Sequence, residues 1–379
     1  MNIAFITPEY PISSFSGNIG GIGTFTKTLA EQLIKNNCNA TIFIHSQFNE
    51  EVITENGVEI HLVKKKVVKG ITWYTNRRYF NKYVNKVVKQ KNIQVIEAPE
   101  WTGFTAFMKF NCPLVIRLHG SDTYFCDLEN RNVKVKNKFF EKKALTGADK
   151  IIGVSNFVAK KTQGLFKLNN DIDVIHNTID TVLFTPNHQQ VKSKTLLYFG
   201  TIIRKKGVLE IAKAFNKVIE KDKDVQLCLL GRDNVDIITE KSTLTIFRGL
   251  LSEKAKANFK YYEALPYQKV IKYIQRSDIV LLPSFAEAFP MTWLEAMALE
   301  KKLVTSNIGW AKELMIDGVT GFTVNPKDSN KFSEKILELL HDNTLASQMA
   351  INARNRIINE FDIQQSMVKN IVMYKSILK

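Results

Sequence analysis

The chain has 379 residues, which is more than one ordinary hydrophobic core accommodates, so we expect two domains. Hydrophobic residues make up 45% of it and aromatic residues 10%, a composition that excludes an intrinsically disordered protein. The net charge of +16 calls for an anionic partner. Nucleic acid, an anionic membrane and a diphosphate-bearing substrate would each satisfy it, and charge alone does not choose among them.

The spacing of the cysteines and the residues at the start of the sequence indicate the cellular compartment in which the protein is expected to lie. Cys38, Cys112, Cys126 and Cys228 are scattered, without metal-ligand or CxxC spacing, which indicates a reduced interior. A strand-like run starts at Ile3 with no basic and apolar leader before it, so we expect no signal peptide. The aliphatic runs are too short to span a bilayer. We therefore expect a cytoplasmic protein, with peripheral attachment to the inner face of the cell membrane left open.

Short aliphatic or β-branched runs alternate with helix-length stretches along the whole chain. The predicted strands, in order, are 3–7, 40–45, 58–63, 93–98, 114–119, 150–154, 172–176, 195–200, 226–231, 244–248, 279–283 and 303–306. Helices are predicted between them, among others at 24–35, 208–221 and 267–277, and the chain is predicted to be helical throughout from residue 330. This alternation is typical of βαβ units and parallel sheets covered by helices.

The domain boundary is predicted at a polar segment that contains Pro186. We expect a first domain at 1–184, a linker at 185–194 and a second domain at 195–358. Residues 359–379 are long enough to form a helix that returns to the first domain.

A glycine cluster, 17–23, follows the first strand and precedes a helix that opens at Thr24. Glycines at such a place, Gly20 and Gly21 among them, let backbone N–H groups approach an anion at a helix N-terminus. Thr26 stands where a dinucleotide fingerprint needs its third glycine, which disfavours a dehydrogenase. A tight strand-to-helix turn with no ligand is the structural alternative.

Within 283–299, Glu287 lies at a predicted strand exit, and Glu295 lies about two turns into the predicted helix that follows. Ligands bind at strand exits of open α/β sheets, and carboxylates there accept hydrogen bonds from sugar hydroxyls or a ribose. The alternative is a solvated helix face, but the neighbours of Glu295 are apolar, and an unpaired carboxylate among them would be costly.

Two further strand exits carry polar residues. Gly200 ends a strand and is followed by Arg204 and Lys206, cations suited to a diphosphate, unless this is a solvated basic loop. His119 ends a first-domain strand next to Gly120 and either hydrogen-bonds a sugar hydroxyl or is structural. Two DxD triplets, at 171–173 and 222–224, lie at strand entrances, so we interpret them as turns and expect no metal.

The segment 283–298, ending in Leu-Glu-Ala-Met-Ala, resembles the paired-glutamate signature of glycosyltransferase family 4, retaining enzymes of GT-B fold. Segments 308–322 and 175–180 are also similar to that family, and the resemblance covers essentially the whole chain. It implies an α/β protein of GT-B architecture, in which two Rossmann-like domains with parallel sheets face each other across a cleft. It implies no cofactor other than a nucleotide-sugar donor, a UDP- or GDP-sugar, and a saccharide or lipid-linked saccharide acceptor in bacterial cell-surface polysaccharide or glycan synthesis.

The resemblance also implies roles for individual residues. Catalytic roles fall to His119, Glu287, Arg204 and Lys206. Donor-binding roles fall to Gly20, Gly21, Gly200, Thr201, Gly231, Ala288, Phe289, Pro290, Met291 and Glu295. Two departures affect these roles: Thr201 stands where the family carries an arginine, and Pro290 replaces a glycine and has no N–H to donate.

Three other classes remain as alternatives: a sugar-nucleotide epimerase, the dehydrogenase already disfavoured, and a nucleic-acid-binding protein, for which no recognisable module is present. We expect no nucleic-acid partner. From Lys64 to Lys91 there are ten Lys or Arg residues and no acid, which predicts peripheral binding of the first domain to an anionic membrane. The residues expected to face that membrane are Arg77, Arg78, Lys82, Lys86 and Lys89.

Overall fold

The computed structural model describes residues 1–12, 20–169 and 171–378 and divides the chain into two compact units. The first unit comprises Met1–Asn177 and Gln364–Lys379, and the second comprises Thr178–Ile363. The segment 185–194, expected to be a linker, therefore lies inside the second unit. The last residues of the chain group with the first unit, so this unit is built from two separate pieces of sequence.

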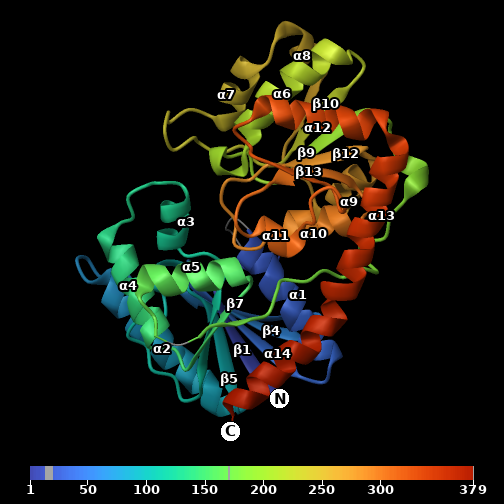
Figure 1. The fold of residues 1–379 in the computed structure, drawn as a ribbon. Coiled ribbons are helices and arrows are strands. Elements are labelled where there is room, and N and C mark those ends of the chain that lie inside the picture. The colour runs from blue at the N-terminus through green and yellow to red at the C-terminus, as the bar shows by residue number, and fades with distance from the viewer. Residues whose placement is uncertain (13–19, 170, 379) are drawn as a thin grey trace. The chain divides into compact units, whose positions relative to one another are not determined.

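The first unit is built on an eight-stranded sheet with the order β3-β4-β2-β1-β5-β6-β7-β8 (Figure 1). Its strands are β1 (Asn2–Thr7), β2 (Asn39–Gln47), β3 (Glu51–Glu55), β4 (Val58–Lys64), β5 (Val95–Pro99), β6 (Leu114–Leu118), β7 (Lys150–Gly153) and β8 (Asp173–Val174). All adjacent pairs are parallel except β3 and β4, which form an antiparallel edge.

Helices cover both faces of this sheet. They are α1 (Gly21–Lys35), α2 (Thr72–Lys91), α3 (Asp122–Leu128), α4 (Val135–Thr146), α5 (Asn156–Phe166) and α14 (Ile363–Ile377). In β2, Ile42 and Ile44 join the core formed with α1 and α14, whereas Phe43 packs at 6.5 Å against Phe80 of α2. Because successive side chains of a strand point to opposite faces, this alternation places α2 on the face opposite α1 and α14.

A buried polar cluster joins α14 to the sheet. Arg117 of β6 donates from Nε and Nη2 to the two carboxylate oxygens of Glu97 in β5, at 2.7 and 2.9 Å. Arg117 also donates to Asn370 Oδ1 (2.6 Å), and the hydroxyl of Tyr374 donates to Glu97 (2.7 Å). All four side chains are at most 3% exposed. Two residues of the sheet and two of the last helix thus hydrogen-bond one another away from water, and Nη1 of Arg117 is left buried without a hydrogen-bond partner among the described residues.

The second unit contains a six-stranded sheet, order β11-β10-β9-β12-β13-β14, whose adjacent strands are all parallel. Its strands are β9 (Thr195–Phe199), β10 (Gln226–Leu230), β11 (Phe259–Tyr262), β12 (Ile279–Leu282), β13 (Lys302–Ser306) and β14 (Phe322–Val324). Its helices are α6 (Val208–Lys221), α7 (Thr243–Leu250), α8 (Glu253–Ala257), α9 (Tyr267–Arg276), α10 (Met291–Ala298), α11 (Ala311–Leu314), α12 (Ser329–His341) and α13 (Asn343–Glu360). Figure 1 shows α6 and α12 on one face of this sheet and α9 and α10 on the other.

The predicted α/β class with two parallel-sheet domains is confirmed, and eleven of the twelve predicted strands coincide with observed ones. The strand predicted at 244–248 is wrong, because these residues lie in α7. Ser242 caps that helix by accepting the N–H of Thr245, and Leu244 and Phe247 are buried at helical spacing. The edge strands β3, β11 and β14 were not predicted.

A basic and aromatic surface lies where α2, the segment 104–107 and α4 meet in the first unit. Its exposed apolar members are Trp73, Tyr74, Phe107, Val135 and Phe139, and its cations include Arg78, Lys136 and Lys143. Phe107 lies 6.0 Å from Phe139, and Lys143 lies 6.0 Å from the Phe139 ring. The acid within α4, Glu141, is buried and caps α3 through the N–H groups of Asp122 and Thr123, so it does not offset these cations at the surface.

Arg77 is a correction to the residues expected to face a membrane. Its guanidinium is half-buried, stacks 4.3 Å over Phe140, and donates to the carbonyl oxygens of Phe104 and Gly103 at 3.1 Å. Arg77 therefore joins α2 to the segment before Phe107. The other four, Arg78, Lys82, Lys86 and Lys89, are exposed.

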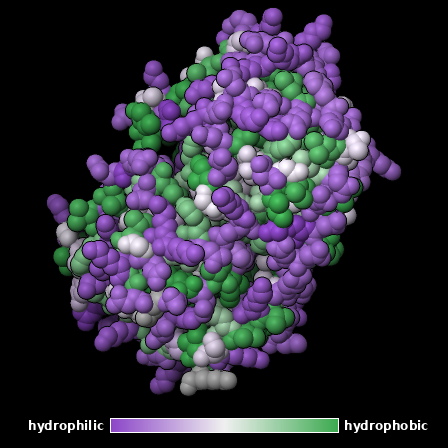
Figure 2. Space-filling view, in the orientation of Figure 1, coloured by the Kyte–Doolittle hydropathy of each residue, from purple (hydrophilic) through white to green (hydrophobic). Residues whose placement is uncertain are grey.

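No helix in the described ranges combines the length and the hydropathy that crossing a bilayer requires. Figure 2 shows hydrophilic residues over most of the visible face, interrupted by smaller hydrophobic patches.

The buried cluster generates a stability prediction. Arg117→Met is expected to destabilise the first unit by about 3–5 kcal/mol, because it leaves the Glu97 carboxylate buried without its cation. Urea-induced unfolding, followed by circular dichroism, measures the change. Arg131→Met is the matched control: Arg131 pairs with Glu129 at a partly exposed site, so a loss of about 1 kcal/mol or less is expected. Equal effects of the two substitutions would contradict the role given to the buried pair.

Candidate active site

Each sheet has a topological switch point, where the chain direction across the sheet reverses. β1 lies between β2 and β5 in the first sheet, and β9 lies between β10 and β12 in the second. Ligands of open α/β sheets bind outside the carboxyl ends of strands at such points. The residues that follow β1 and β5, and those that follow β9 and β12, are therefore the candidates in each unit.

In the second unit, the expected phosphate cation and the expected sugar-binding acid lie in direct contact. Lys206 belongs to the short helical turn Arg204–Lys206 after β9, and Glu287 follows β12. Lys206 Nζ donates to Glu287 Oε1 at 2.5 Å. Their side chains are 25% and 10% exposed. A cation and an anion therefore lie in contact just beyond the carboxyl ends of β9 and β12, where the switch point is.

Two glycines allow these loops to pack closely. A Cβ atom on Gly207, which follows Lys206 and has φ +73°, would lie 2.0 Å from the carbonyl oxygen of Pro283. A Cβ atom on Gly231, at the end of β10 with φ +150°, would lie 1.9 Å from the carbonyl oxygen of Gly200. Backbone contacts this close require glycine. The loops after β9, β10 and β12 thus form one packed rim, with Thr201 exposed on it.

Arg204 has a structural partner that the sequence did not reveal. Its Nε and Nη2 donate to the two carboxylate oxygens of Asp236 at 2.7 and 2.9 Å. The Arg204 guanidinium holds the pKa of the buried Asp236 carboxyl well below its usual range. Because two donor nitrogens of Arg204 are committed to this pair, its expected contact with a diphosphate depends on the remaining N–H groups and stays a prediction.

The helix α10 starts directly after the loop that carries Glu287. Pro290 caps it, Met291 is its first residue, and Ala288 and Phe289 are buried before it. Glu295, one turn into α10, is buried and accepts a hydrogen bond from the hydroxyl of Tyr267 at 2.5 Å. Burial raises the pKa of Glu295 to about 7, against the lowering effect of the Tyr267 hydrogen bond.

In the first unit, the start of α1 is already held by a carboxylate. Gly20 precedes α1, Gly21 is its first residue, and the N–H of Gly23 donates to Glu9 Oε1 at 2.8 Å. Burial raises the pKa of Glu9. Gly17, Asn18 and Ile19 of the predicted glycine cluster lie outside the described residues.

His119 lies at the end of β6, and its ring contacts Phe25 at 4.8 Å. Burial, with Arg117 nearby, lowers the pKa of His119 to about 3, so its ring is neutral at neutral pH and can both donate and accept. The fully buried Glu100 accepts the N–H groups of His119 (3.0 Å) and Gly120 (2.6 Å). Burial raises the pKa of Glu100 to about 8.

Sequence reasoning missed Glu9, Glu100, Tyr267 and Asp236. A signal was present for the first two: each follows a proline directly at a strand end, as Pro8-Glu9 after β1 and Pro99-Glu100 within and after β5. The other two, Tyr267 and Asp236, contact site residues that are distant in the sequence, so no local sequence pattern indicates them. Among the residues that the structure describes, no three His, Cys, Asp or Glu side chains are grouped as metal ligands would be.

Family models match both halves of the chain. Residues 19–183 match the model of Glycosyltransferase Family 4, and residues 180–356 match that of Glycosyl transferases group 1. The chain is a family 4 glycosyltransferase. The comparisons do not support the epimerase, dehydrogenase or nucleic-acid-binding alternatives.

Named relatives of the enzyme agree with this assignment. It is 26% identical over 345 residues to an uncharacterized glycosyltransferase of Methanocaldococcus jannaschii, with 89% of each chain covered. It is 27% identical over 254 residues to CapM, a capsular polysaccharide biosynthesis glycosyltransferase of Staphylococcus aureus, with 63% of this chain and 64% of CapM covered.

Solved structures establish the GT-B fold of the enzyme. Sucrose-phosphate synthase from Thermosynechococcus elongatus aligns with a TM-score of 0.81 at 18% identity, covering 99% of this chain and 98% of that one. Anabaena HepE, solved in complex with UDP, aligns with a TM-score of 0.76 at 18% identity, covering 99% and 100%.

The raised pKa of Glu295 predicts a pH dependence of stability. Between the ordinary value of 4.5 and about 7, the folded enzyme holds a proton on Glu295 that the unfolded chain releases. The free energy of unfolding of the second unit therefore falls as pH rises through that window, by at most about 1.4 kcal/mol per pH unit from this group. Glu295→Gln removes this contribution, which denaturant unfolding across the window measures.

Two variants control this measurement. Glu334→Gln changes an exposed acid of α12 and should leave the slope in that window as it is in the parent. Tyr267→Phe removes the hydrogen bond that lowers the Glu295 pKa, so the window should extend to higher pH. Identical pH profiles for the parent and Glu295→Gln would refute the assignment of a buried, protonated Glu295.

Proposed function

We propose that the enzyme transfers a hexose from a UDP- or GDP-sugar, with retention of anomeric configuration, to a saccharide or lipid-linked saccharide acceptor. The observation that carries this proposal is the Lys206–Glu287 contact of 2.5 Å at the switch point of the second sheet. A cation for the leaving diphosphate and an acid for the sugar hydroxyls stand side by side, as transfer from a sugar diphosphate requires.

The chemistry gives each group a task. Breaking the bond between the anomeric carbon and phosphate increases negative charge on the diphosphate, and Lys206 and the start of α10 stabilise it more as the bond breaks. Glu287 accepts hydrogen bonds from the hexose and orients it. Glu295 accepts from the ribose, and Gly200, Thr201 and Gly231 form the rim against which the nucleotide lies.

The attacking hydroxyl group of the acceptor must lose its proton during the transfer. An oxygen of the leaving phosphate takes it as the acceptor attacks on the same face, so no separate nucleophile or base is required. His119, neutral at physiological pH, hydrogen-bonds a sugar hydroxyl, and Glu100 fixes its backbone. Cations take the place of a divalent metal, so excess EDTA should leave the transfer rate unchanged.

The choice of donor and acceptor is supported by similar proteins. HepE has been solved with UDP and with UDP-glucose, and CapM is named for capsular polysaccharide biosynthesis. By analogy we propose a uridine donor before a guanosine donor, and an acceptor in cell-surface glycan synthesis. A thermal-shift screen with UDP, GDP and their sugars tests the donor, because a ligand of the folded state raises the melting temperature.

We further propose that the first unit docks on anionic membrane through the basic and aromatic surface defined above. Exposed Trp73, Phe107 and Phe139 can enter the interface between headgroups and acyl chains, while Lys136 and Lys143 lie beside anionic headgroups. Each basic residue near such a surface contributes about 1 kcal/mol. A lipid-linked acceptor would be met at this surface.

Substitutions at the ion pair test the transfer reaction. Glu287→Gln should lower kcat by about 100-fold or more, since a sugar-orienting carboxylate is lost. Lys206→Ala should cost about 2 kcal/mol or more of transition-state stabilisation, which steady-state assays of UDP or GDP release measure.

Lys205→Ala is the matched control for this pair of variants. Lys205→Ala removes the neighbouring charge and keeps the carbonyl oxygen of Lys205, which accepts the N–H of Phe285. In the proposed arrangement Lys206, and not Lys205, contacts the diphosphate. A small effect is therefore expected. Near-normal transfer by Glu287→Gln, or equal losses for Lys205→Ala and Lys206→Ala in folded proteins, would overturn the proposed roles.

Vesicle co-sedimentation tests the membrane proposal. The enzyme should sediment with anionic but not zwitterionic vesicles, and high salt should release it. Lys136→Glu with Lys143→Glu should weaken binding about tenfold or more. Lys254→Glu with Lys256→Glu on α8 of the second unit is the matched control. Absence of binding to anionic vesicles at low salt, or equal losses in both double variants, would rule this surface out.

A further inference from the structure

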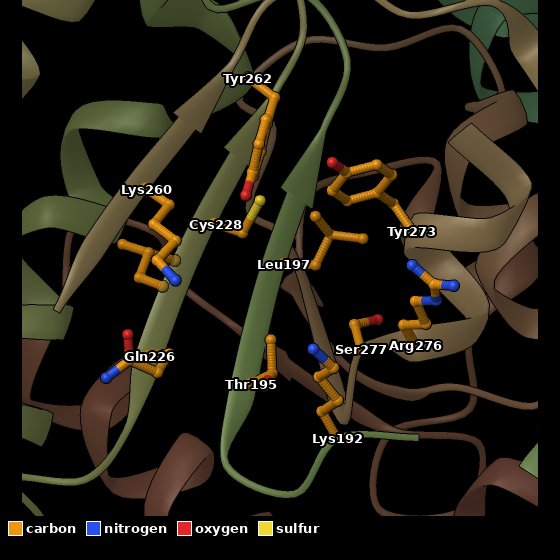
Figure 3. Close-up of a pocket in the computed structure, with 11 residues that line it drawn as sticks. Lys192, Thr195, Leu197, Gln226, Cys228, Lys260, Tyr262, Tyr273, Arg276 and Ser277 are labelled. Carbon is orange, nitrogen blue, oxygen red and sulfur yellow. The ribbon is translucent and has the colours of Figure 1, made fainter. Parts of the chain in front are cut away.

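A cavity of about 340 Å³ lies over one face of the second sheet (Figure 3). Alternate residues of three neighbouring strands form its floor: Thr195 and Leu197 of β9, Gln226 and Cys228 of β10, and Lys260 and Tyr262 of β11. Residues two apart in a strand share a face, so these six residues mark one continuous stretch of sheet. Tyr273 and Arg276 of α9, three residues apart on a helix, form the wall.

This cavity is separate from the candidate active site of the same unit. None of the second-unit residues assigned there, from Gly200 to Glu295, lines it. The active-site residues follow the carboxyl ends of β9, β10 and β12. Thr195 and Gln226, by contrast, are the first residues of β9 and β10, so the cavity extends toward the opposite edge of the sheet.

The lining is positively charged. Lys192, Lys260 and Arg276 border the cavity, and no Asp or Glu among the residues that the structure describes does so. In Figure 3, Lys260 and Lys192 reach the space over β9 and β10 from different sides, and Arg276 stands along α9. None of the ion pairs in the described part of the chain involves these three, whereas Lys194, Lys206 and Lys302 of the same unit each pair with a carboxylate.

The three cations are held near one another by the fold. The backbone N–H of Lys192 donates to the carbonyl oxygen of Arg276 at 2.8 Å, which fixes the segment before β9 beside the end of α9. Lys260 is placed by the pairing of β11 with β10. A recess lined by one sign of charge concentrates ions of the other sign, so this cavity favours an anion.

Two tyrosines at the cavity form an aromatic corner, which would contact a ring-bearing ligand but not an inorganic anion. The rings of Tyr262 and Tyr273 lie 5.0 Å apart at an angle of 59°, and they form a corner at one end. Tyrosine faces pack against the C–H groups of a sugar ring or against a base, and tyrosine hydroxyls can hydrogen-bond its polar atoms.

We propose that this cavity binds a phosphate monoester carried on a ring, as in a sugar phosphate or a nucleoside monophosphate. The phosphate lies among Lys192, Lys260 and Arg276, where charge-assisted hydrogen bonds are available. The ring lies in the corner of Tyr262 and Tyr273. The proposal does not depend on the transfer reaction, because it concerns other residues on another part of the sheet.

Calorimetric titrations of the whole enzyme, in the presence of excess UDP, test this site. The probes are glucose 1-phosphate, AMP, inorganic phosphate and glucose. Glucose 1-phosphate or AMP should bind, glucose should not, and inorganic phosphate should bind more weakly because it lacks a ring. The better of the two ring-bearing probes identifies the class of ligand.

The double variant Lys260→Gln/Arg276→Gln should weaken binding of the phosphate esters about tenfold or more. Lys269→Gln/Lys272→Gln is the matched control: it removes the same charge, from α9, at positions that do not line the cavity, and should bind as the parent does. Tyr273→Ala should weaken the ring-bearing probes and leave inorganic phosphate unaffected.

Three results would overturn the proposal. They are no binding of either phosphate ester, equal losses in the two double variants, and inorganic phosphate binding as tightly as the esters. A parallel UDP titration of Lys260→Gln/Arg276→Gln without other ligands separates this test from the proposed function. UDP affinity unchanged with ester binding lost supports the site, whereas absence of UDP binding in every variant, the parent included, counts against the donor assignment alone.

Discussion

The first unit is completed by a helix that comes from the far end of the chain, and a buried ion pair holds that helix in place. The charges of Arg117 and Glu97 neutralise each other in the sheet. Asn370 of α14 accepts a further hydrogen bond from Arg117, and Tyr374 of α14 donates one to Glu97. In a low-dielectric interior, unmet polar groups are costly, so these residues accept few other arrangements. Glu100 and His119 directly follow the same two strands, β5 and β6, so the cluster also positions the loops at the candidate site.

In the second unit, charge is arranged differently. Lys206 and Glu287 lie at a strand-end rim, partly open to water, and neutralise each other. In the proposed reaction, a sugar diphosphate brings an anion for the lysine and hydroxyl groups for the glutamate. When the donor binds, the ion pair between Lys206 and Glu287 would be replaced by a contact of Lys206 with the diphosphate and a contact of Glu287 with the sugar. Neither side chain would then be desolvated without a partner. Arg204 with Asp236 has less freedom to do this, because Asp236 is fully buried.

The sequence predicted the fold class because its parallel strands are short apolar runs with clear ends. It failed at 244–248, where Leu244 and Phe247 fit a buried strand as well as a helix, and only Ser242 indicated a cap. The edge strands β3 and β11 carry no fully buried residue, so their hydrophobic periodicity is weak. Partners such as Asp236 for Arg204, and the cavity beside Tyr273, arise from three-dimensional packing between residues far apart in the chain, which no local pattern encodes.

The interrupted first unit has a consequence for the order in which the chain folds during synthesis. All 186 residues of the second unit, Thr178–Ile363, leave the ribosome before the part of α14 that belongs to the first unit, which starts at Gln364. At about 5–20 residues per second, that interval lasts roughly 10–40 s. During it the second unit can fold as one continuous piece. Until α14 is made, the apolar face of the first sheet that packs against Met367 and Met373 stays exposed to water. Arg117 and Glu97 lack their partners Asn370 and Tyr374 during the same interval. The nascent enzyme therefore passes through a stage in which its earlier-made half is the less finished one, and that half is where a chaperone would find its binding site.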